Sequence, residues 1–239
     1  SPNVLAIRVD NARMDIPPIS GDFTFFGGIY RDMWLTAVPD QHFNLTNHGS
    51  DGIFISTPQV SEEKATLSIR GEIKNDAREK ANLELIHSIY QPDGTLLQTL
   101  KKSIQLKPGE TYAFQNAASP ILYPRLWTPE TPALYRIETT LRDRKTKVVL
   151  DQSNHHTGFR WFHFDADKGF FLNGKPYKLR GICRHQDQKP IGVALTDEMH
   201  RRDMKLMKEM GANFIRISHY PQDDAIIEMC DKLGMLAWE

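Results

Sequence analysis

The hydrophobic pattern of this chain changes once, near Gly158, and that change constrains the fold more than any other feature. Between about Gln41 and about Asn154, short runs with strand character recur about every ten residues. After Gly158, strand-like runs instead alternate with amphipathic helical segments. Because these two patterns belong to different layer architectures, we expect the chain to contain two kinds of domain.

The strand-rich part has the features of an antiparallel β-sandwich. Apolar and polar side chains alternate over residues 65–73, which is the period of a strand with one buried face. Pro-Asp-Gly at 92–94 and Lys-Pro-Gly-Glu at 107–110 are turn sequences. Seven short strands over about 110 residues indicate an immunoglobulin-like β-sandwich, although the cysteine pair of antibody domains is absent. The strands are expected at 54–55, 65–73, 83–90, 96–106, 111–115, 135–141 and 147–150.

The part after Gly158 has the order strand, helix, strand, helix, strand. The strands are expected at 177–183, at 213–218 and from 235 onward. Thr196 can cap the first helix, whose first turn would hold Asp197 and Glu198. This order requires parallel strands. Three of them form only a thin sheet, so we expect the sequence to end inside a larger α/β domain of a longer protein.

The first forty residues contain two further strand-like runs, at 4–9 and 29–38. Two strands cannot bury enough surface to be stable alone. We therefore expect this segment to be the tail of a larger sheet domain or an appendage of the neighbouring sandwich.

Charge and hydropathy restrict the partners. Thirty basic and thirty acidic residues balance, which argues against binding to nucleic acid or an anionic membrane. No apolar stretch approaches the length of a membrane span, and the first residues lack a signal-peptide pattern. We expect a soluble protein, cytoplasmic or periplasmic, with the compartment left open. Cys183 and Cys230 are too few for a disulfide framework and are expected to be buried thiols.

Polar residues gather at the predicted carboxyl ends of the parallel strands, where α/β folds place their functional groups. The first strand would deliver Arg184, His185 and Asp187, the second His219 and the third Glu239. A histidine that follows a strand is often only structural, but the coincidence across strands favours a binding role. Imidazole and guanidinium groups suit hydroxyl-rich or carboxylate partners, a description that sugars fit.

Arg216 lies inside the second predicted strand, on the face that Ser218 shares. Its guanidinium could hold a catalytic carboxylate in the ionised form. The spacing fits a buried ion pair without a catalytic task equally well, so both interpretations stay open.

Five motifs, in order along the chain, resemble those of glycoside hydrolase family 2, which includes β-galactosidases, β-glucuronidases and β-mannosidases. The motifs are NVLAIRVDN at 3–11 with GGIYRDMWL at 27–35, LWTPETPALY at 126–135, FFLNGKP at 170–176, RGICRH at 180–185 and RISHYP at 216–221. The resemblance implies that residues 1–40 are the C-terminal strands of a jelly-roll sugar-binding domain. It also implies that residues 41–157 form the immunoglobulin-like sandwich and 158–239 the first part of a (β/α)8 TIM barrel, the catalytic domain.

The resemblance also implies roles for individual residues. Asp22 falls where the family has an aspartate that reaches the active site and contacts the sugar. His185 and His219 fall on histidines that bind hydroxyls of the sugar, and Arg216 on an arginine that supports the nucleophilic glutamate. Asp187 is a further expected substrate contact, although Gln186-Asp187 departs from the glutamate-containing version of several relatives. Arg184, at the same strand end, is also expected to bind substrate.

The family's reaction is retaining hydrolysis by two glutamates. The resemblance implies that both lie after Glu239, which matches neither. We therefore expect the protein to be a β-galactosidase-like enzyme that cleaves terminal β-galactosides, and the isolated chain to be inactive, with no catalytic residue of its own. The resemblance allows a Mg or Na ion and a homo-oligomer, although no complete metal site can be identified in the sequence. The alternatives are a non-catalytic carbohydrate-binding or structural sandwich, and the same family acting on β-glucuronides or β-mannosides.

Overall fold

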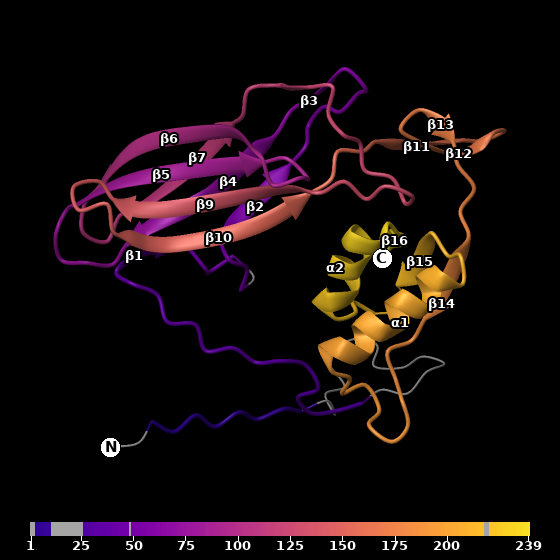
Figure 1. Ribbon diagram of the computed structural model, residues 1–239. Coiled ribbons are helices and arrows are strands. Elements are labelled where there is room, and N and C mark those ends of the chain that lie inside the picture. The colour runs from indigo at the N-terminus through magenta and orange to yellow at the C-terminus, as the bar shows by residue number, and fades with distance from the viewer. Residues whose placement is uncertain (1–2, 11–25, 48, 218–219) are drawn as a thin grey trace. The chain divides into compact units, whose positions relative to one another are not determined.

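The computed structural model describes residues 3–10, 26–47, 49–217 and 220–239 (Figure 1). The chain divides into two compact units. One unit comprises Thr36–Leu179 with Asp231–Gly234, and the other comprises Ser1–Leu35, Arg180–Cys230 and Met235–Glu239. The predicted domain limits at residues 40 and 157 stay predictions.

The larger unit is built around two antiparallel sheets (Figure 1). In the first sheet, β4 is paired by three strands; its members are β1 (Gln41–Phe43), β2 (Ile53–Ser56), β4 (Ser68–Asn75) and β7 (Thr111–Ala117). The second sheet has the order β10 (Val149–Thr157), β9 (Tyr135–Asp143), β5 (Ala81–Tyr90) and β6 (Leu96–Leu106). A short pair is formed by β3 (Lys64–Ala65) and β8 (Ile121–Leu122). This is the predicted immunoglobulin-like β-sandwich.

Alternating side chains of these strands form the core. Leu83, Leu85 and Ile89 of β5 point inward, and each is at most 1% exposed. Leu141 of β9 lies opposite Leu85 and is fully buried. Because side chains of a strand alternate between its faces, the sequence period of two places one apolar row in the core. The prediction of strands in this part of the chain is therefore confirmed, but the predicted bounds differ. The largest difference is in β10, which extends to Thr157, whereas the prediction was 147–150.

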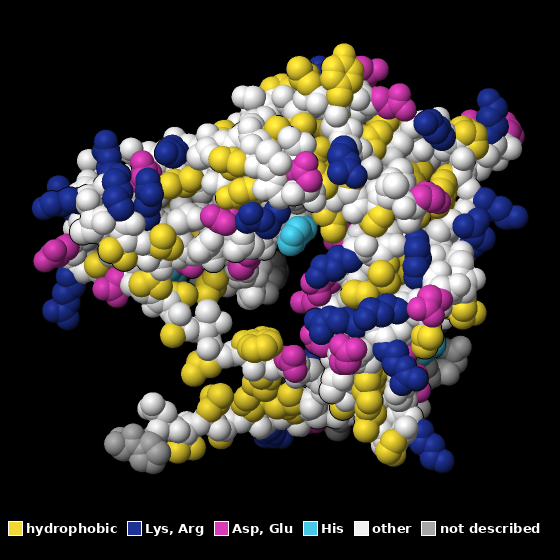
Figure 2. Space-filling model, in the orientation of Figure 1, with side chains coloured by type: hydrophobic (Ala, Val, Ile, Leu, Met, Phe, Trp, Pro, Cys, Tyr) yellow, Lys and Arg dark blue, Asp and Glu magenta, His cyan; other side chains and the backbone are white. Residues whose placement is uncertain are grey.

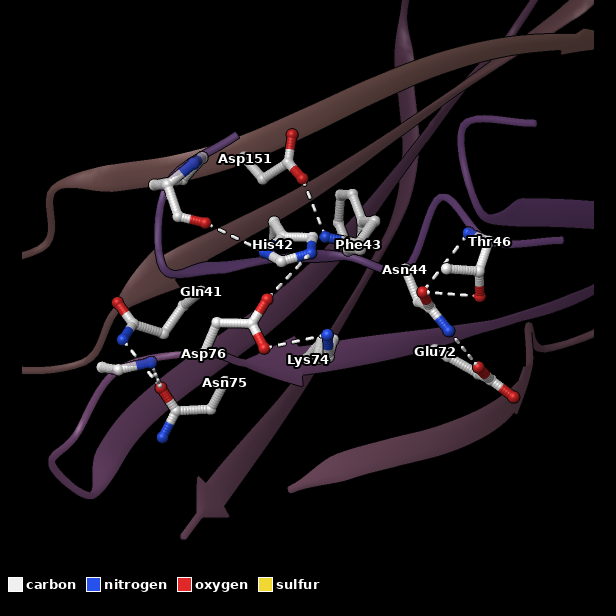
Figure 3. A network of polar contacts seen from close by, with 12 residues as sticks. Gln41, His42, Phe43, Asn44, Thr46, Glu72, Lys74, Asn75, Asp76 and Asp151 are labelled. Atoms are coloured by element: carbon white, nitrogen blue, oxygen red, sulfur yellow. Dashed lines mark hydrogen bonds and ion pairs between the residues drawn. The ribbon is translucent and has the colours of Figure 1, made fainter. Parts of the chain in front are cut away.

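Polar contacts attach β1 to both sheets (Figure 3). The backbone N–H of Phe43 donates to Asp151 Oδ2 of β10 at 2.8 Å, and Asn44 Nδ2 donates to Glu72 Oε2 of β4 at 2.7 Å. His42 Nδ1 lies 2.9 Å from the carbonyl oxygen of Pro39. A strand of three residues has few ladder hydrogen bonds, so these side-chain contacts hold it in place.

His87 is buried between the two sheets of the sandwich. Asn116 Nδ2 lies 2.9 Å from its Nε2 and Thr139 Oγ1 lies 3.0 Å from its Nδ1. An amide nitrogen donates, so Nε2 accepts and Nδ1 carries the proton. Burial lowers the pKa of His87 to about 4, because a charged imidazole in this position would lose its water.

A three-stranded meander comes after the sandwich. Its strands are β11 (Phe162–Asp165), β12 (Gly169–Leu172) and β13 (Lys175–Pro176). Asn173 at its second turn donates from Nδ2 to the carbonyl oxygen of Trp127, at 3.1 Å. Trp127 in turn donates from Nε1 to the carbonyl oxygen of Asp231, at 2.9 Å. These bonds place the meander and residues 231–234 with the sandwich unit.

The smaller unit contains the predicted β-α-β-α-β order. Its elements are β14 (Gly181–Arg184), α1 (Asp197–Glu209), β15 (Phe214–Ile217), α2 (Asp224–Leu233) up to Cys230, and β16 (Leu236–Trp238). The three strands are parallel, with β15 in the middle. Thr196 caps α1, because its Oγ1 accepts the backbone N–H of Met199 at 3.4 Å. These five elements are the start of a TIM barrel, as predicted.

Three local expectations were wrong. Residues 3–10 and 26–38 form no strand, because no described segment supplies a partner for their backbone hydrogen bonds. Residues 177–180 are likewise outside β14. Cys183 is exposed, because it alternates on β14 with the buried Arg184, whereas Cys230 is buried as expected.

Surface chemistry agrees with the balanced composition. On the face drawn in Figure 2, positively and negatively charged side chains are interspersed. Among the described residues, no helix is long and apolar enough to cross a membrane.

Candidate active-site edge

The chain after β14 alternates between buried and exposed side chains. Arg184 and Gln186 are 5% and 2% exposed, whereas His185 and Asp187 are exposed. The two-residue period of the strand thus continues past its end. It leaves His185 and Asp187 accessible to a ligand and directs Arg184 and Gln186 into the protein.

Arg184 is held by groups of the smaller unit. Its Nε and Nη2 donate to Asp203 Oδ2 of α1 at 3.1 and 2.6 Å, and its Nη1 donates to Gln222 Oε1 at 3.0 Å. Gln222 Nε2 donates back to the carbonyl oxygen of Arg184. A guanidinium group with these partners orients the strand end. The predicted contact of Arg184 with substrate stays a prediction.

His200 of α1 completes this cluster. Its Nδ1 lies 3.1 Å from Nη2 of Arg184, and the side chain is buried. Burial lowers the pKa of His200, and the positive charge of Arg184 lowers it further. The imidazole is therefore neutral near pH 7, and its Nδ1 accepts a hydrogen bond from Arg184.

Tyr220 positions the segment that carries His185. Its hydroxyl accepts the backbone N–H of Gln186 at 3.1 Å and lies 3.5 Å from His185 Nδ1. The two rings meet edge to face, with centroids 5.9 Å apart. Gln186 Oε1 also accepts the backbone N–H of Asp223 at 3.3 Å. The exposed imidazole thus stands on a backbone that is fixed from two sides.

Arg216 and Trp238 are partners in the parallel ladder between β15 and β16. The guanidinium carbon of Arg216 lies 5.7 Å from the centroid of the Trp238 ring, a cation–π distance. Arg216 is half-buried at the edge where Glu239 follows β16. Its predicted support of a nucleophilic glutamate stays a prediction.

Asp22 and His219 lie outside the described residues. The expected convergence of Asp22, His185 and His219 on one opening therefore stays a prediction. The structure does bring Arg184, His185 and Asp187 to the same strand end, with Arg216 on the next strand.

Some supporting residues were not found from the sequence. Asp203, His200 and Gln222 lie on or before helices, with no motif to distinguish them from ordinary surface or core residues. The only available signal was the helical spacing of His200 and Asp203, which puts them on one side of α1.

Comparison with known proteins agrees with this architecture. The family model described as "Glycosyl hydrolases family 2" matches residues 51–160, and that described as "Glycosyl hydrolases family 2, TIM barrel domain" matches residues 166–238. The chain belongs to glycosyl hydrolase family 2.

Three relatives resemble the chain over nearly its whole length. A Bacteroides fragilis protein named beta-glucuronidase is 36% identical over 99% of the chain, which spans 34% of that relative. A Formosa agariphila protein named putative beta-glucuronidase is 37% identical over 99% of the chain, which spans 27% of it. A Bacteroides ovatus protein named beta-galactosidase BoGH2A is 31% identical, with the chain spanning 27% of it. The chain thus spans about a third of these relatives or less.

Some solved structures have a higher sequence identity to the chain than these relatives. The Bacteroides uniformis beta-glucuronidase 2 structure, covalently bound to cyclophellitol-6-carboxylate aziridine, is 85% identical. It matches 96% of this chain and 28% of that one, with a TM-score of 0.94. A variant described as a calcium binding mutant of the same enzyme, with two aspartates replaced by alanine, is 84% identical over 96% of this chain and 28% of that one, with a TM-score of 0.90.

Proposed function

We propose that this chain is part of a longer retaining glycoside hydrolase that cleaves terminal β-glucuronides. The observation that carries the proposal is the 85% identity to a Bacteroides uniformis β-glucuronidase over 96% of the chain. At that identity, the packing around a site changes little. The proposal adopts the alternative of a β-glucuronide substrate over our first expectation of a β-galactoside. The relatives at 36% and 37% identity are named for glucuronidase, and one at 31% is named for galactosidase.

The chemistry of the described edge supports this role. His185 is exposed on a fixed backbone, and Arg216 lies one strand away beside an aromatic ring. Imidazole nitrogens bind sugar hydroxyls, and a guanidinium group keeps a neighbouring carboxylate ionised. The family reaction needs such an ionised carboxylate as nucleophile and a second carboxyl as acid and base. In this proposal both come from parts of the protein beyond this chain.

Hydrolysis of two chromogenic substrates tests the sugar. The full-length protein should cleave p-nitrophenyl β-D-glucuronide with a kcat/KM at least about 100-fold above that for the β-D-galactoside, because a site that binds a carboxylate rejects a substrate that lacks it. A preference for the galactoside would restore our first expectation. Binding without hydrolysis of either would favour the non-catalytic carbohydrate-binding module.

We also infer that the protein binds calcium. The support is the relative at 84% identity that is described as a calcium binding mutant. Calcium is a hard cation that prefers oxygen ligands. Carboxylate oxygens of this kind line a cavity in the smaller unit of the chain. This inference is independent of the sugar that is cleaved.

A further inference from the structure

A cavity of about 430 Å³ lies between residues 31–34 and the first turns of α1 and α2. Five carboxylates and two guanidinium groups line it. Three of the acids come from separate segments: Asp32 from the amino-terminal segment, Asp197 from the start of α1 and Asp223 from the residue before α2. The excess of negative charge makes the cavity attractive to a cation.

The position of Asp223 is fixed by the helix that it caps. Its Oδ1 accepts the backbone N–H of Ala225 at 3.0 Å, and its own N–H donates to Gln186 Oε1 at 3.3 Å. Asp197 is the first residue of α1, which Thr196 caps. Both carboxylates therefore stand on rigid helix ends, as a preorganised ligand must.

An independent observation connects these two residues with calcium. In the solved calcium binding mutant, the two aspartates replaced by alanine stand 26 positions apart in the sequence. In this chain Asp197 and Asp223 are also 26 positions apart, and no other two aspartates have that spacing. The only aspartate pair with the matching spacing thus lines the acidic cavity.

We propose that Asp197, Asp223 and Asp32 bind a calcium ion in this cavity, an assignment that rests on the proposed calcium binding. Calcium takes six to eight oxygen ligands, so backbone carbonyls or water complete the shell. The ion fastens residues 31–34 to the beginning of the barrel. Arg31 already makes one such link, because its Nη2 donates to the carbonyl oxygen of Pro221.

Arg201 competes with the cation for the same oxygen atoms. Its Nη2 lies 2.8 Å from Asp197 Oδ2 and 3.7 Å from Glu228 Oε2. Within the described ranges, no three His, Cys, Asp or Glu side chains form a finished metal site. The guanidinium of Arg201 occupies a carboxylate oxygen of Asp197, so calcium must displace it in order to bind there.

Calorimetric titration of the full-length, calcium-stripped protein with CaCl2 tests the assignment. Asp197→Asn and Asp223→Asn should each weaken binding at least about 100-fold, and Asp32→Asn about 10-fold, because ligand charge sets calcium affinity. Glu198→Gln is the matched control: Glu198 follows Asp197 on α1 but does not line the cavity, and its variant should bind like the wild type. Arg201→Gln should tighten binding several-fold, because it removes the competing charge.

The outcomes separate the two inferences. If the wild-type protein takes up no calcium, both the proposed calcium binding and this site are wrong. If it takes up calcium with the same affinity in Asp197→Asn and Asp223→Asn, calcium binding stands and the site is overturned. If those variants do not fold, Arg201→Gln decides, because unchanged or weaker binding there contradicts the competition on which the site depends.

Tryptic cleavage after Arg31 gives a second measurement. Calcium should slow this cleavage several-fold in the wild type and not in Asp32→Asn. Equal rates with and without calcium in the wild type would show that the ion does not fasten residues 31–34.

Discussion

The guanidinium of Arg184 donates twice to one carboxylate oxygen of Asp203, from Nε at 3.1 Å and from Nη2 at 2.6 Å. The arginine side chain is 4% exposed and the aspartate 26%. This pair joins the end of β14 to α1, and therefore sets the direction in which the next residue, His185, leaves the strand.

Breaking this ion pair should lower the stability of the smaller unit. Asp203→Asn should lower the free energy of unfolding by about 2–3 kcal/mol, because it leaves the buried guanidinium without its counter-charge. Urea denaturation of the 239-residue chain, followed by tryptophan fluorescence, measures the loss. The control is Glu209→Gln, at the exposed end of α1, which should change stability by less than about 0.5 kcal/mol. Equal stability of the two variants would show that the pair contributes nothing.

The buried His87 should make the sandwich sensitive to acid. Its pKa is about 4 in the folded chain against 6.5 unperturbed, so the unfolded chain binds more protons as the pH falls below about 6.5. From pH 7 to pH 5 this one group should lower the free energy of unfolding by about 2 kcal/mol, and the loss should level off below pH 4.

The variant His87→Gln tests the origin of this pH dependence. Glutamine cannot titrate but can still hydrogen-bond to Asn116 and Thr139, so the stability difference between pH 7 and pH 5 should shrink by about 2 kcal/mol. An undiminished difference in urea denaturation would assign the acid sensitivity to other groups.

His185 should matter for catalysis and not for stability. In the full-length protein, His185→Ala should lower kcat/KM for the glucuronide by about 100-fold. The loss or misplacement of one contact with the sugar typically reduces transition-state stabilisation by about this factor. The melting temperature should stay within about 2 °C, because the side chain is exposed. His163→Ala removes another exposed histidine, on β11, and is the matched control. Equal activities of the two variants would remove His185 from the site.

The isolated chain should not hydrolyse any of these glycosides. In the proposed mechanism both catalytic glutamates come from outside these residues, and retaining hydrolysis needs both. The chromogenic assay at high protein concentration checks this. Turnover near that of the full-length protein would show that the chain contains a complete catalytic site.

Sequence patterns predicted those helices and strands that depend on interactions between residues close together in the sequence. The alternation in β4 and β5 and the cap at Thr196 were predictable because each depends on neighbouring residues only. The runs at 4–9 and 29–38 were predicted as strands and are not, because a strand also needs a partner that no local pattern supplies.

The candidate site was predictable in position but not in its supporting contacts. The rule that functional groups follow parallel strands placed Arg184 and His185 at the end of the first strand, where the structure has them, and their role in binding stays a prediction. It did not reveal that Arg184 turns inward to Asp203 and Gln222, because these partners come from elements 19 and 38 residues away. The acidic cavity was missed for the same reason: Asp32, Asp197 and Asp223 are ordinary residues until the fold brings them together.

The relative kcat/KM of the full-length protein for β-glucuronide and β-galactoside tests the central claim most directly. We predict that the glucuronide is preferred by at least about 100-fold, and that the preference requires the carboxylate of the sugar. Equal rates, or a preference for the galactoside, would contradict the assignment to β-glucuronides.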